Sequence, residues 1–362
     1  MLRPPTTPQY VPDVALIHVA NGVTSAEQAR LFARVGGHVI RTISELHAVA
    51  VKVPHGTLGA ALGKLRASGL AASVTRDEVF HVLSMPAPND ANYNLQWGVQ
   101  KASFPQAWTR TRGRRSVVVA VLDTGVNGDV PDLVGNVKPG IDLTGTGLTD
   151  VDGHGTAVAG IIAAHANNGI GGAGVCSNCM IQPIKVMGND GTGDLATVAQ
   201  GIVQAADLHA QVIDLSLGGP VGLDVLQQAV DYAIAKGSVV VAAAGNGGDG
   251  ALNYPASYPD VIGVAGTNQV DRLYTWSERG KWVQVAAPGC NVAPLVTGGY
   301  GIFCGTSSAT PLVAGLAALA ASYKPTAGVA RISRAIETTA HKIGPIAGHG
   351  RINAGAALAA LH

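Results

Sequence analysis

The sequence has no apolar run long enough to cross a membrane, which takes about 18 residues in a helix. The nearest candidate, residues 312–321, is shorter and is interrupted by Gly315. The N-terminal segment Met1–Pro5 also lacks the apolar stretch of a signal peptide. We therefore expect no membrane partner.

Charged residues are scarce, at 13% of 362 residues, and the formal net charge is only +1. Such a balance gives no electrostatic reason to expect nucleic acid or an anionic membrane as a partner. The hydrophobic content of 47% excludes a disordered chain. The length allows about two domains, each with an ordinary core.

Cysteines are few as well. The sequence has four, at Cys176, Cys179, Cys290 and Cys304, which allow three pairings. We favour Cys176 with Cys179 and Cys290 with Cys304, because the members of each pair are close in sequence. Two such disulfides suit an oxidising compartment. We therefore expect a secreted protein whose export signal is not part of this sequence.

The first 85 residues alternate strand and helix signals. We expect strands over 14–19, 39–43, 48–53 and 72–83, with helices over 26–35 and 57–67. Thr24 or Ser25 can cap the first helix, and Gly36-Gly37 can end it. The result is a small α+β unit with an antiparallel sheet. A polar segment with Pro86 and Pro88 follows and indicates a linker.

From Trp97 onward, continuous apolar strands alternate with helical segments. This pattern predicts a parallel sheet covered by helices on both faces. The expected strands and helices are residues 116–122, 154–165, 180–186, 195–208, 212–217, 223–235, 238–244, 261–266 and 306–322.

Three short segments rich in glycine and small residues each carry one reactive side chain. They are Val119–Gly125 with Asp123, Gly153–Gly160 with His154, and Gly305–Pro311 with Ser307. The order Asp, His, Ser is that of the catalytic triad in subtilisin. With all three segments in this order, the chain closely resembles the subtilisin-like serine proteases, the subtilases.

This resemblance implies a role for each residue. Asp123 would orient and stabilise the imidazole, and His154 would act as general base and then general acid. Ser307 would be the nucleophile, at the positive end of a helix where Pro311 falls in or near the first turn. Asn246, after a buried strand, resembles the asparagine that donates to the oxyanion.

The resemblance also implies the fold and organisation. We expect a doubly wound, mostly parallel α/β domain over 95–362, preceded by a ferredoxin-like α+β propeptide over 1–85. Residues 86–94 would form the linker and maturation region. Self-cleavage would fall between about Val82 and Asn89. The catalytic domain would be a monomeric serine endopeptidase that cleaves polypeptides and binds calcium. The propeptide would act as its chaperone and inhibitor. A permanent binding domain is the alternative for this unit.

Two segments resemble the edges that hold an extended substrate in this family. One contains Ser216, Leu217 and Gly218, and the other contains Gly191 and Gly193, followed by Leu195 as a pocket lining. Glycine lets a foreign backbone approach closely. Asn253 corresponds to the floor of the primary specificity pocket, where no charged residue is evident. We therefore expect apolar or small side chains before the cut.

The segment 166–172 resembles a subtilase calcium loop. Calcium takes six to eight oxygen ligands, backbone carbonyls included. The candidate ligands are the carboxylates of Asp90 and Asp132, the Asn168 side chain, and the carbonyls of Ala166, Ile170 and Gly172. A glycine-rich loop without an ion is the alternative.

Other interpretations are weaker. Ser308, which replaces the methionine of the family motif, is a rival nucleophile, but Ser307 alone follows Gly-Thr in register. Residues 169–174 match Gly-x-Gly-x-x-Gly but lack the preceding strand that dinucleotide binding requires. Cys176-x-x-Cys179 has no second pair for a zinc site. A catalytically inactive subtilase that binds peptides remains an alternative function.

Overall fold

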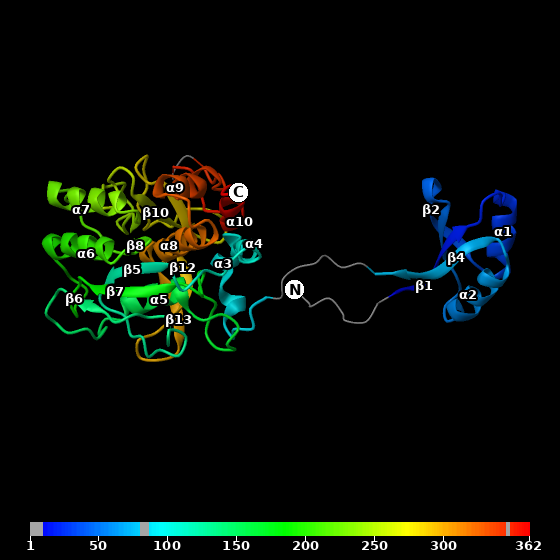
Figure 1. The fold of residues 1–362 in the computed structure, drawn as a ribbon, viewed down its shortest axis with the longest axis horizontal. Helices are drawn as coiled ribbons and strands as arrows, with labels where there is room; N and C mark the ends of the chain where they lie inside the picture. Colours follow the sequence, from blue (N-terminus) through cyan, green and yellow to red (C-terminus); the bar gives the residue numbers. More distant parts are fainter. Residues whose placement is uncertain (1–9, 80–86, 345–347) are drawn as a thin grey trace. The chain divides into compact units, whose positions relative to one another are not determined.

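The computed structural model describes residues 10–79, 87–344 and 348–362. The chain divides into two compact units, Met1–Pro86 and Ala87–His362 (Figure 1). Each unit has its own hydrophobic core.

The smaller unit has the element order of a ferredoxin-like fold. Its elements are β1 (Tyr10–Val19), α1 (Ser25–Arg34), β2 (His38–Ile43), η1 (Ser44–Leu46), β3 (Ala48–Lys52), α2 (Leu58–Ala67) and β4 (Ala71–Glu78). The strands pair antiparallel in the order β2-β3-β1-β4. Thr24 caps α1 and forms a capping box with Glu27. The predicted α+β unit is confirmed, although β4 ends at Glu78 and residues 80–83 lie outside the described part.

The larger unit is built on a seven-stranded sheet. Its strands are β5 (Val118–Asp123), β6 (Ile141–Asp142), β7 (Met180–Lys185), β8 (Val212–Leu215), β9 (Val239–Ala243), β10 (Ile262–Thr267) and β11 (Val285–Pro288). They pair in parallel in the order β11-β10-β9-β8-β5-β7-β6. The predicted parallel sheet is confirmed.

Helices cover both faces of this sheet. The helical elements are η2 (Tyr93–Leu95), α3 (Trp97–Lys101), α4 (Phe104–Trp108), α5 (His154–Ala163), α6 (Leu195–Asp207), α7 (Asp224–Ala235), α8 (Thr306–Tyr323), α9 (Val329–Thr338) and α10 (Ala354–Ala359). Helices α6 and α7 share one core with Ala120 and Leu122 of β5, whereas α5 and α8 share the other with Val119 and Val121. Successive side chains of β5 therefore point to opposite faces of the sheet and pack into two different cores. Figure 1 shows the helices around this sheet.

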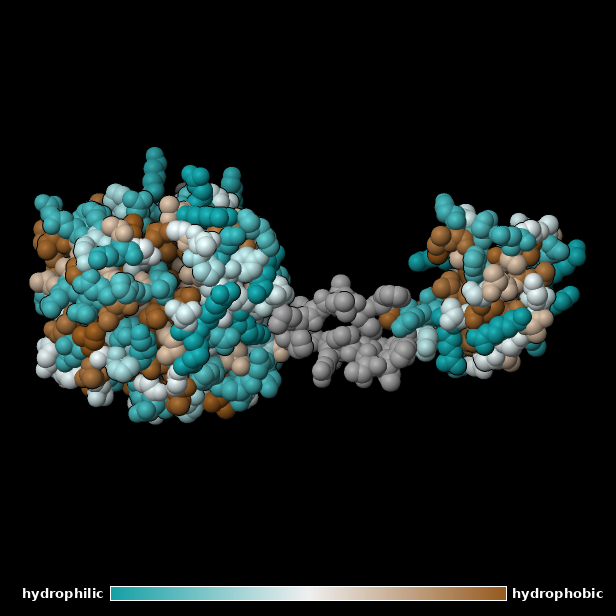
Figure 2. Space-filling view, viewed as in Figure 1, coloured by the Kyte–Doolittle hydropathy of each residue, from teal (hydrophilic) through white to brown (hydrophobic). Residues whose placement is uncertain are grey.

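Sequence analysis did not predict several smaller elements. They include β6, β11, the short helices α3 and α4, and the antiparallel hairpin of β12 (Cys290–Pro294) and β13 (Tyr300–Cys304). On the face shown in Figure 2, hydrophobic and hydrophilic residues are interspersed on both units. Within the described residues, no helix is both long and apolar enough to span a bilayer.

Candidate active site

The structure brings Asp123 and His154 into direct contact. Asp123 is the last residue of β5 and His154 is the first residue of α5. The imidazole Nδ1 lies 2.8 Å from Asp123 Oδ1 and 2.9 Å from Oδ2. This close approach depends on Gly155, because a Cβ there would clash with the Gly125 carbonyl and lie 3.0 Å from Asp123 Cβ.

A buried carboxylate that sequence analysis missed anchors the histidine segment. Asp150 Oδ1 accepts the Thr124 hydroxyl at 2.8 Å and the Gly153 N–H at 2.8 Å. Its Oδ2 accepts the Thr156 N–H at 2.9 Å. The side chain is 2% exposed. Asp150 thus joins the turn after β5 to the start of α5 and fixes both triad residues.

The surroundings of His154 change its basicity. Burial lowers the pKa of the imidazole, but the charge and hydrogen bond of Asp123 outweigh it, and the net effect raises the pKa to about 9. The charge of Asp152 acts in the same direction. Asp152, also missed from the sequence, accepts the His154 backbone N–H at 3.1 Å.

Ser307 is bonded to Ser216, which lines the same cavity as Asp123 and His154, and it does not bond to the imidazole. It is the second residue of α8, and its hydroxyl donates to the Ser216 carbonyl at 2.8 Å. A cavity of about 340 Å³ is lined by Asp123, His154 and Ser216, among others. Phe303, four positions before Ser307, packs edge-on against His154 with ring centroids 5.2 Å apart. Asp123 and His154 therefore meet in one cavity, and Ser307 adjoins it through Ser216 and Phe303.

Pro311 lies just past the first turn of the helix, in or near which it was predicted. The helix starts at Thr306, which places Pro311 in its second turn. Since proline has no N–H, the Ser307 carbonyl lacks its helical donor. The Ser216 hydroxyl instead lies 3.2 Å from that carbonyl oxygen.

The rival nucleophile Ser308 is fully buried. Asn291 Nδ2 lies 3.0 Å from both its hydroxyl and its carbonyl oxygen. A side chain held inside the core cannot reach a substrate, so the geometry favours Ser307 over Ser308.

Asn246 is positioned by the nucleophile segment itself. Its Oδ1 accepts the Thr306 N–H at 2.9 Å and the Thr306 hydroxyl at 3.0 Å. These two bonds orient the amide so that the oxygen faces the start of α8. The Nδ2 group has no hydrogen-bond partner among the described residues, so it is available as a donor.

The predicted substrate-binding segments line two neighbouring cavities. Gly191, Ser216, Leu217 and Gly218 contribute to the cavity beside His154. Gly193, Leu195, Leu217 and Gly218 line a second cavity of about 210 Å³. Asn253 donates its Nδ2 to the Ala243 carbonyl at 2.9 Å and lies directly against Gly218. Any side chain at position 218 would collide with this amide.

Asp90 and Asp132 lie against the predicted calcium loop. Asp90 accepts the backbone N–H groups of Asn167 at 2.9 Å and Asn168 at 3.3 Å. The Asn168 amide donates to Asp132 Oδ1 at 2.6 Å, while Asp132 Oδ2 is buried without a partner. Burial raises the pKa of Asp132, and the Asp90 charge adds to this effect.

The remaining loop residues border this pair of carboxylates. Ile170 is partly exposed, Gly172 packs against the Gln96 side chain, and Ala166 contacts the core. In the described part of the chain, no group of three or more His, Cys, Asp or Glu side chains could hold a metal ion. Any cation here would therefore rely on backbone and amide oxygens beside the two carboxylates.

Both predicted disulfides are present. Cys176 pairs with Cys179 in the loop before β7, and Cys290 pairs with Cys304 across the β12–β13 hairpin. The second bond lies directly before the Gly305 turn that leads into α8. The hairpin that carries Phe303 is thereby tied together next to the nucleophile.

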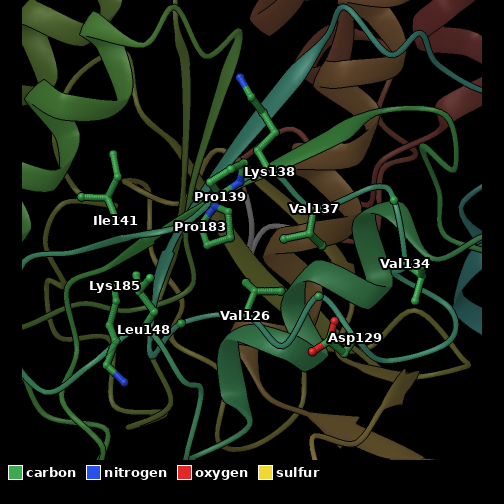
Figure 3. A pocket seen from close by; sticks show the side chains of 14 residues that line it. Val126, Asp129, Val134, Val137, Lys138, Pro139, Ile141, Leu148, Pro183 and Lys185 are labelled. Carbon is green, nitrogen blue, oxygen red and sulfur yellow. The ribbon is translucent and has the colours of Figure 1, made fainter.

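A further cavity, of about 380 Å³, is lined by Gly125 and Val126 at the end of the Asp123 segment. No triad side chain lines it. Val126, Val137, Pro139 and Pro183 gather around it, and Lys138 extends away from them (Figure 3). None of the predicted site residues lines this cavity.

Comparisons with known proteins identify the family of each unit. Residues 114–359 match the subtilase family, and residues 2–74 match the fervidolysin N-terminal prodomain. A thermophilic serine proteinase of Bacillus sp. (strain AK1) is 38% identical over 351 residues, covering 95% of this chain and 86% of that protein. Thermitase of Thermoactinomyces vulgaris is 47% identical over 274 residues, 74% of this chain and 97% of thermitase.

The solved structure of a protease from Pseudoalteromonas arctica PAMC 21717 is similar to this chain, with a TM-score of 0.71 and 32% sequence identity. The match covers 76% of this chain and 100% of the Pseudoalteromonas chain.

Proposed function

Because this chain belongs to the subtilase family of serine peptidases, we propose that it cleaves polypeptides through Asp123, His154 and Ser307. Ser307 attacks the scissile carbonyl while His154 takes the hydroxyl proton. The imidazolium then protonates the leaving amine, which leaves an acyl-enzyme. Water, deprotonated by the same imidazole, attacks the ester and frees Ser307.

The Asp123–His154 pair, in the cavity that Ser216 also lines, is the observation that best supports this proposal. A change of side-chain rotamer would redirect the Ser307 hydroxyl from the Ser216 carbonyl towards the imidazole. The Asn246 amide and the Ser307 N–H at the start of α8 would hold the oxyanion.

Labelling with a fluorophosphonate tests the assignment. We expect one covalent adduct, located at Ser307 by peptide mapping, and no adduct in Ser307→Ala. The matched variant Ser308→Ala should still label. The competing proposal, an inactive subtilase that binds peptides, predicts no adduct in either protein.

We propose that the substrate binds as an extended strand between the segments around Gly191 and Ser216, with its backbone paired to both edges. Asn253 lies against Gly218, and we propose that it forms the floor of the specificity pocket and favours small or apolar side chains before the cut. Profiling of cleavage sites in a denatured protein mixture tests this preference. Frequent cleavage after Lys, Arg, Asp or Glu contradicts it.

We propose that residues 1–85 are a propeptide that assists folding, inhibits the enzyme and is removed by self-cleavage. The prodomain match over residues 2–74 supports this division. The expected bond lies between about Val82 and Asn89, and residues 82–86 of that segment are outside the described structure. Residues 87–94 would complete the maturation region, although Asn89 and Asp90 lie within the larger unit and accept the backbone N–H groups of Gly169 and Asn167.

Intact mass tests the zymogen proposal. Ser307→Ala should remain a single 36.6 kDa chain, whereas the parent splits into two pieces. If the parent stays whole and still digests casein, the unit at the N-terminus is a permanent domain.

We also propose a structural calcium ion at Asp90, Asp132 and the 166–172 loop. Asp132 Oδ2 is buried without a partner, and the Asp90 charge lies close to it. A bound cation would give Oδ2 a partner and would offset the repulsion between the two carboxylates. Asn168, Ala166, Ile170 and Gly172 would supply the other protein oxygens. The ion would stabilise the loop and takes no part in the chemistry.

The two disulfides support a further proposal, that the enzyme works outside the cell. We also propose that it is a monomer. Detection of the mature enzyme in the culture medium of the producing cell, with both disulfides intact by mass spectrometry, tests the compartment. Retention in a reducing cytosol contradicts it.

A further inference from the structure

The sheet carries an acidic side chain directly behind the nucleophile. Asp214 lies on β8, in the middle of the seven strands, with Val121 of β5 and Val241 of β9 opposite it in register. Those two valines belong to the core that contains α5 and α8. The Asp214 side chain is fully buried, and neither the proposed mechanism nor the motifs of the sequence account for it.

Asp214 is connected to Ser307 through Ser216. Asp214 Oδ1 lies 2.8 Å from the Ser216 hydroxyl, and Asp214 Oδ2 has no partner among the described residues. The same Ser216 hydroxyl lies 3.2 Å from the Ser307 carbonyl oxygen. In return, the Ser307 hydroxyl donates to the Ser216 carbonyl at 2.8 Å.

The number of hydrogen-bond donors around Ser216 favours an uncharged Asp214. The Ser307 carbonyl needs a donor other than the helix, because Pro311 has no N–H. Ser216 has one hydroxyl proton, and an ionised Asp214 would compete for it since a carboxylate can only accept. A protonated Asp214 instead donates to the Ser216 oxygen, and Ser216 is then free to donate to the Ser307 carbonyl. In this series of hydrogen bonds, the polar side-chain atoms of Asp214 and Ser216 and the Ser307 carbonyl all have a partner, except for the uncharged Oδ2 of Asp214.

We propose that Asp214 is a positioning residue that works as an uncharged carboxylic acid, donating its proton to Ser216 so that Ser216 can hold the Ser307 carbonyl. Ionisation of Asp214 would pull the Ser216 proton away and loosen the first turn of α8. The proposal rests on the proposed function, since it concerns the placement of that nucleophile.

The electrostatic surroundings agree with a neutral acid. Burial raises the pKa of Asp214 to about 8, and the nearby Asp123 charge adds to this, while Ser216 and His154 oppose it. Asp123 at the end of β5 and His154 at the start of α5 are the charged groups that act on it. The facing parts of β9 and α8, Val241 and residues 306–311, carry no acidic or basic side chain.

The pH dependence of kcat tests the proposal. Neutral Asp214 is present below its pKa and is lost as the pH rises, so kcat of the parent should fall by about tenfold or more by about pH 10. In Asp214→Asn the amide donates to Ser216 at every pH, so this descending limb should disappear and kcat above about pH 9 should be at least as high as the parental maximum. Glu337→Gln, which changes another carboxyl with a raised pKa, should keep the limb. Asp214 and His154 interact, so the measured midpoints belong to the pair.

Infrared spectroscopy gives a readout that does not need activity. At neutral pH the parent should show the C=O stretch of a protonated carboxylic acid that is lost on alkaline titration. The band should be absent in Asp214→Asn and present in Glu337→Gln. If the chain has no peptidase activity at any pH, the proposed function fails and this band still decides the state of Asp214.

Three results would overturn the proposal: a kcat of the parent that stays level to about pH 10, a descending limb that persists in Asp214→Asn, or no protonated-acid band assignable to Asp214. The first needs no variant, so it decides the matter even if Asp214→Asn does not fold.

Discussion

The imidazole of His154 lies within hydrogen-bonding distance of both carboxylate oxygens of Asp123, at 2.8 and 2.9 Å. Because Asp123 is only 2% exposed, water cannot replace it as the partner of Nδ1. The carboxylate therefore fixes which ring nitrogen carries the proton and leaves Nε2 for Ser307.

Asp123→Asn should abolish most activity without unfolding the protein. The amide preserves the shape but favours the wrong imidazole tautomer, so we expect kcat to fall by about 10⁴-fold, the loss known for the same change in another triad. KM should change little. Kinetics with a chromogenic peptide measure both values. Asp129→Asn, a nearby exposed carboxylate, is the control and should match the parent, and a variant at position 123 with near-parental kcat removes Asp123 from the triad.

Activity should rise with pH above the range of an ordinary histidine. The protonated imidazole cannot act as a base, so activity is absent below the His154 pKa and appears as the pH rises through it. The sequence alone predicts a midpoint near the unperturbed value of about 6.5. Since Asp123 raises the pKa to about 9 despite the opposing effect of burial, we expect a midpoint clearly above 6.5.

The pH profile of kcat/KM measures this midpoint. Asp152→Asn removes a second carboxylate that raises the pKa of His154 and should move the midpoint to lower pH. Because Asp152 is exposed, solvent screens its charge and the movement should be less than about one unit. A parental midpoint at or below pH 6.5 contradicts the electrostatic argument.

The sequence predicted those features that depend on neighbouring residues. The motifs around Asp123, His154 and Ser307 place each reactive group at the end of a strand or the start of a helix, and the elements form where expected. Alternating and continuous apolar runs likewise predicted both sheets.

Features that depend on distant segments were not predictable. Asp150 joins Thr124 to Thr156, and Asp214 reaches Ser307 through Ser216, but neither pairing leaves a periodic or motif signal. Because α8 begins at Thr306, the Ser307 carbonyl would normally accept the N–H of residue 311, which proline lacks. Helix boundaries are hard to place from a sequence, so this missing donor was not predicted. The β12–β13 hairpin was missed because its strands are short and interrupted by proline and glycine.

Asn246→Ala should lower kcat by about 100-fold or more while KM changes little, because the amide contributes only when the oxyanion forms. This magnitude is borrowed from subtilisin. Asn246 Oδ1 also accepts two bonds from Thr306, so the loss could arise from a displaced helix. Asn246→Asp is the control, since it keeps an oxygen for Thr306 but removes the donor. Equal kcat values in Asn246→Asp and the parent would exclude Asn246 from the oxyanion site.

Calcium removal should lower the thermal stability of the larger unit. Ser307→Ala protein is the suitable material, because it cannot digest itself as the loop opens. At about 100 times its dissociation constant, a bound ion stabilises the folded state by about 2.7 kcal/mol. We therefore expect a higher Tm by calorimetry in calcium than in chelator, with the difference lost in Asp132→Asn. Asp142→Asn should keep the difference, because Asp142 serves another loop by accepting Thr144 and Gly147. Identical Tm values with and without calcium would show that Asp90 and Asp132 hold the 166–172 loop through hydrogen bonds alone.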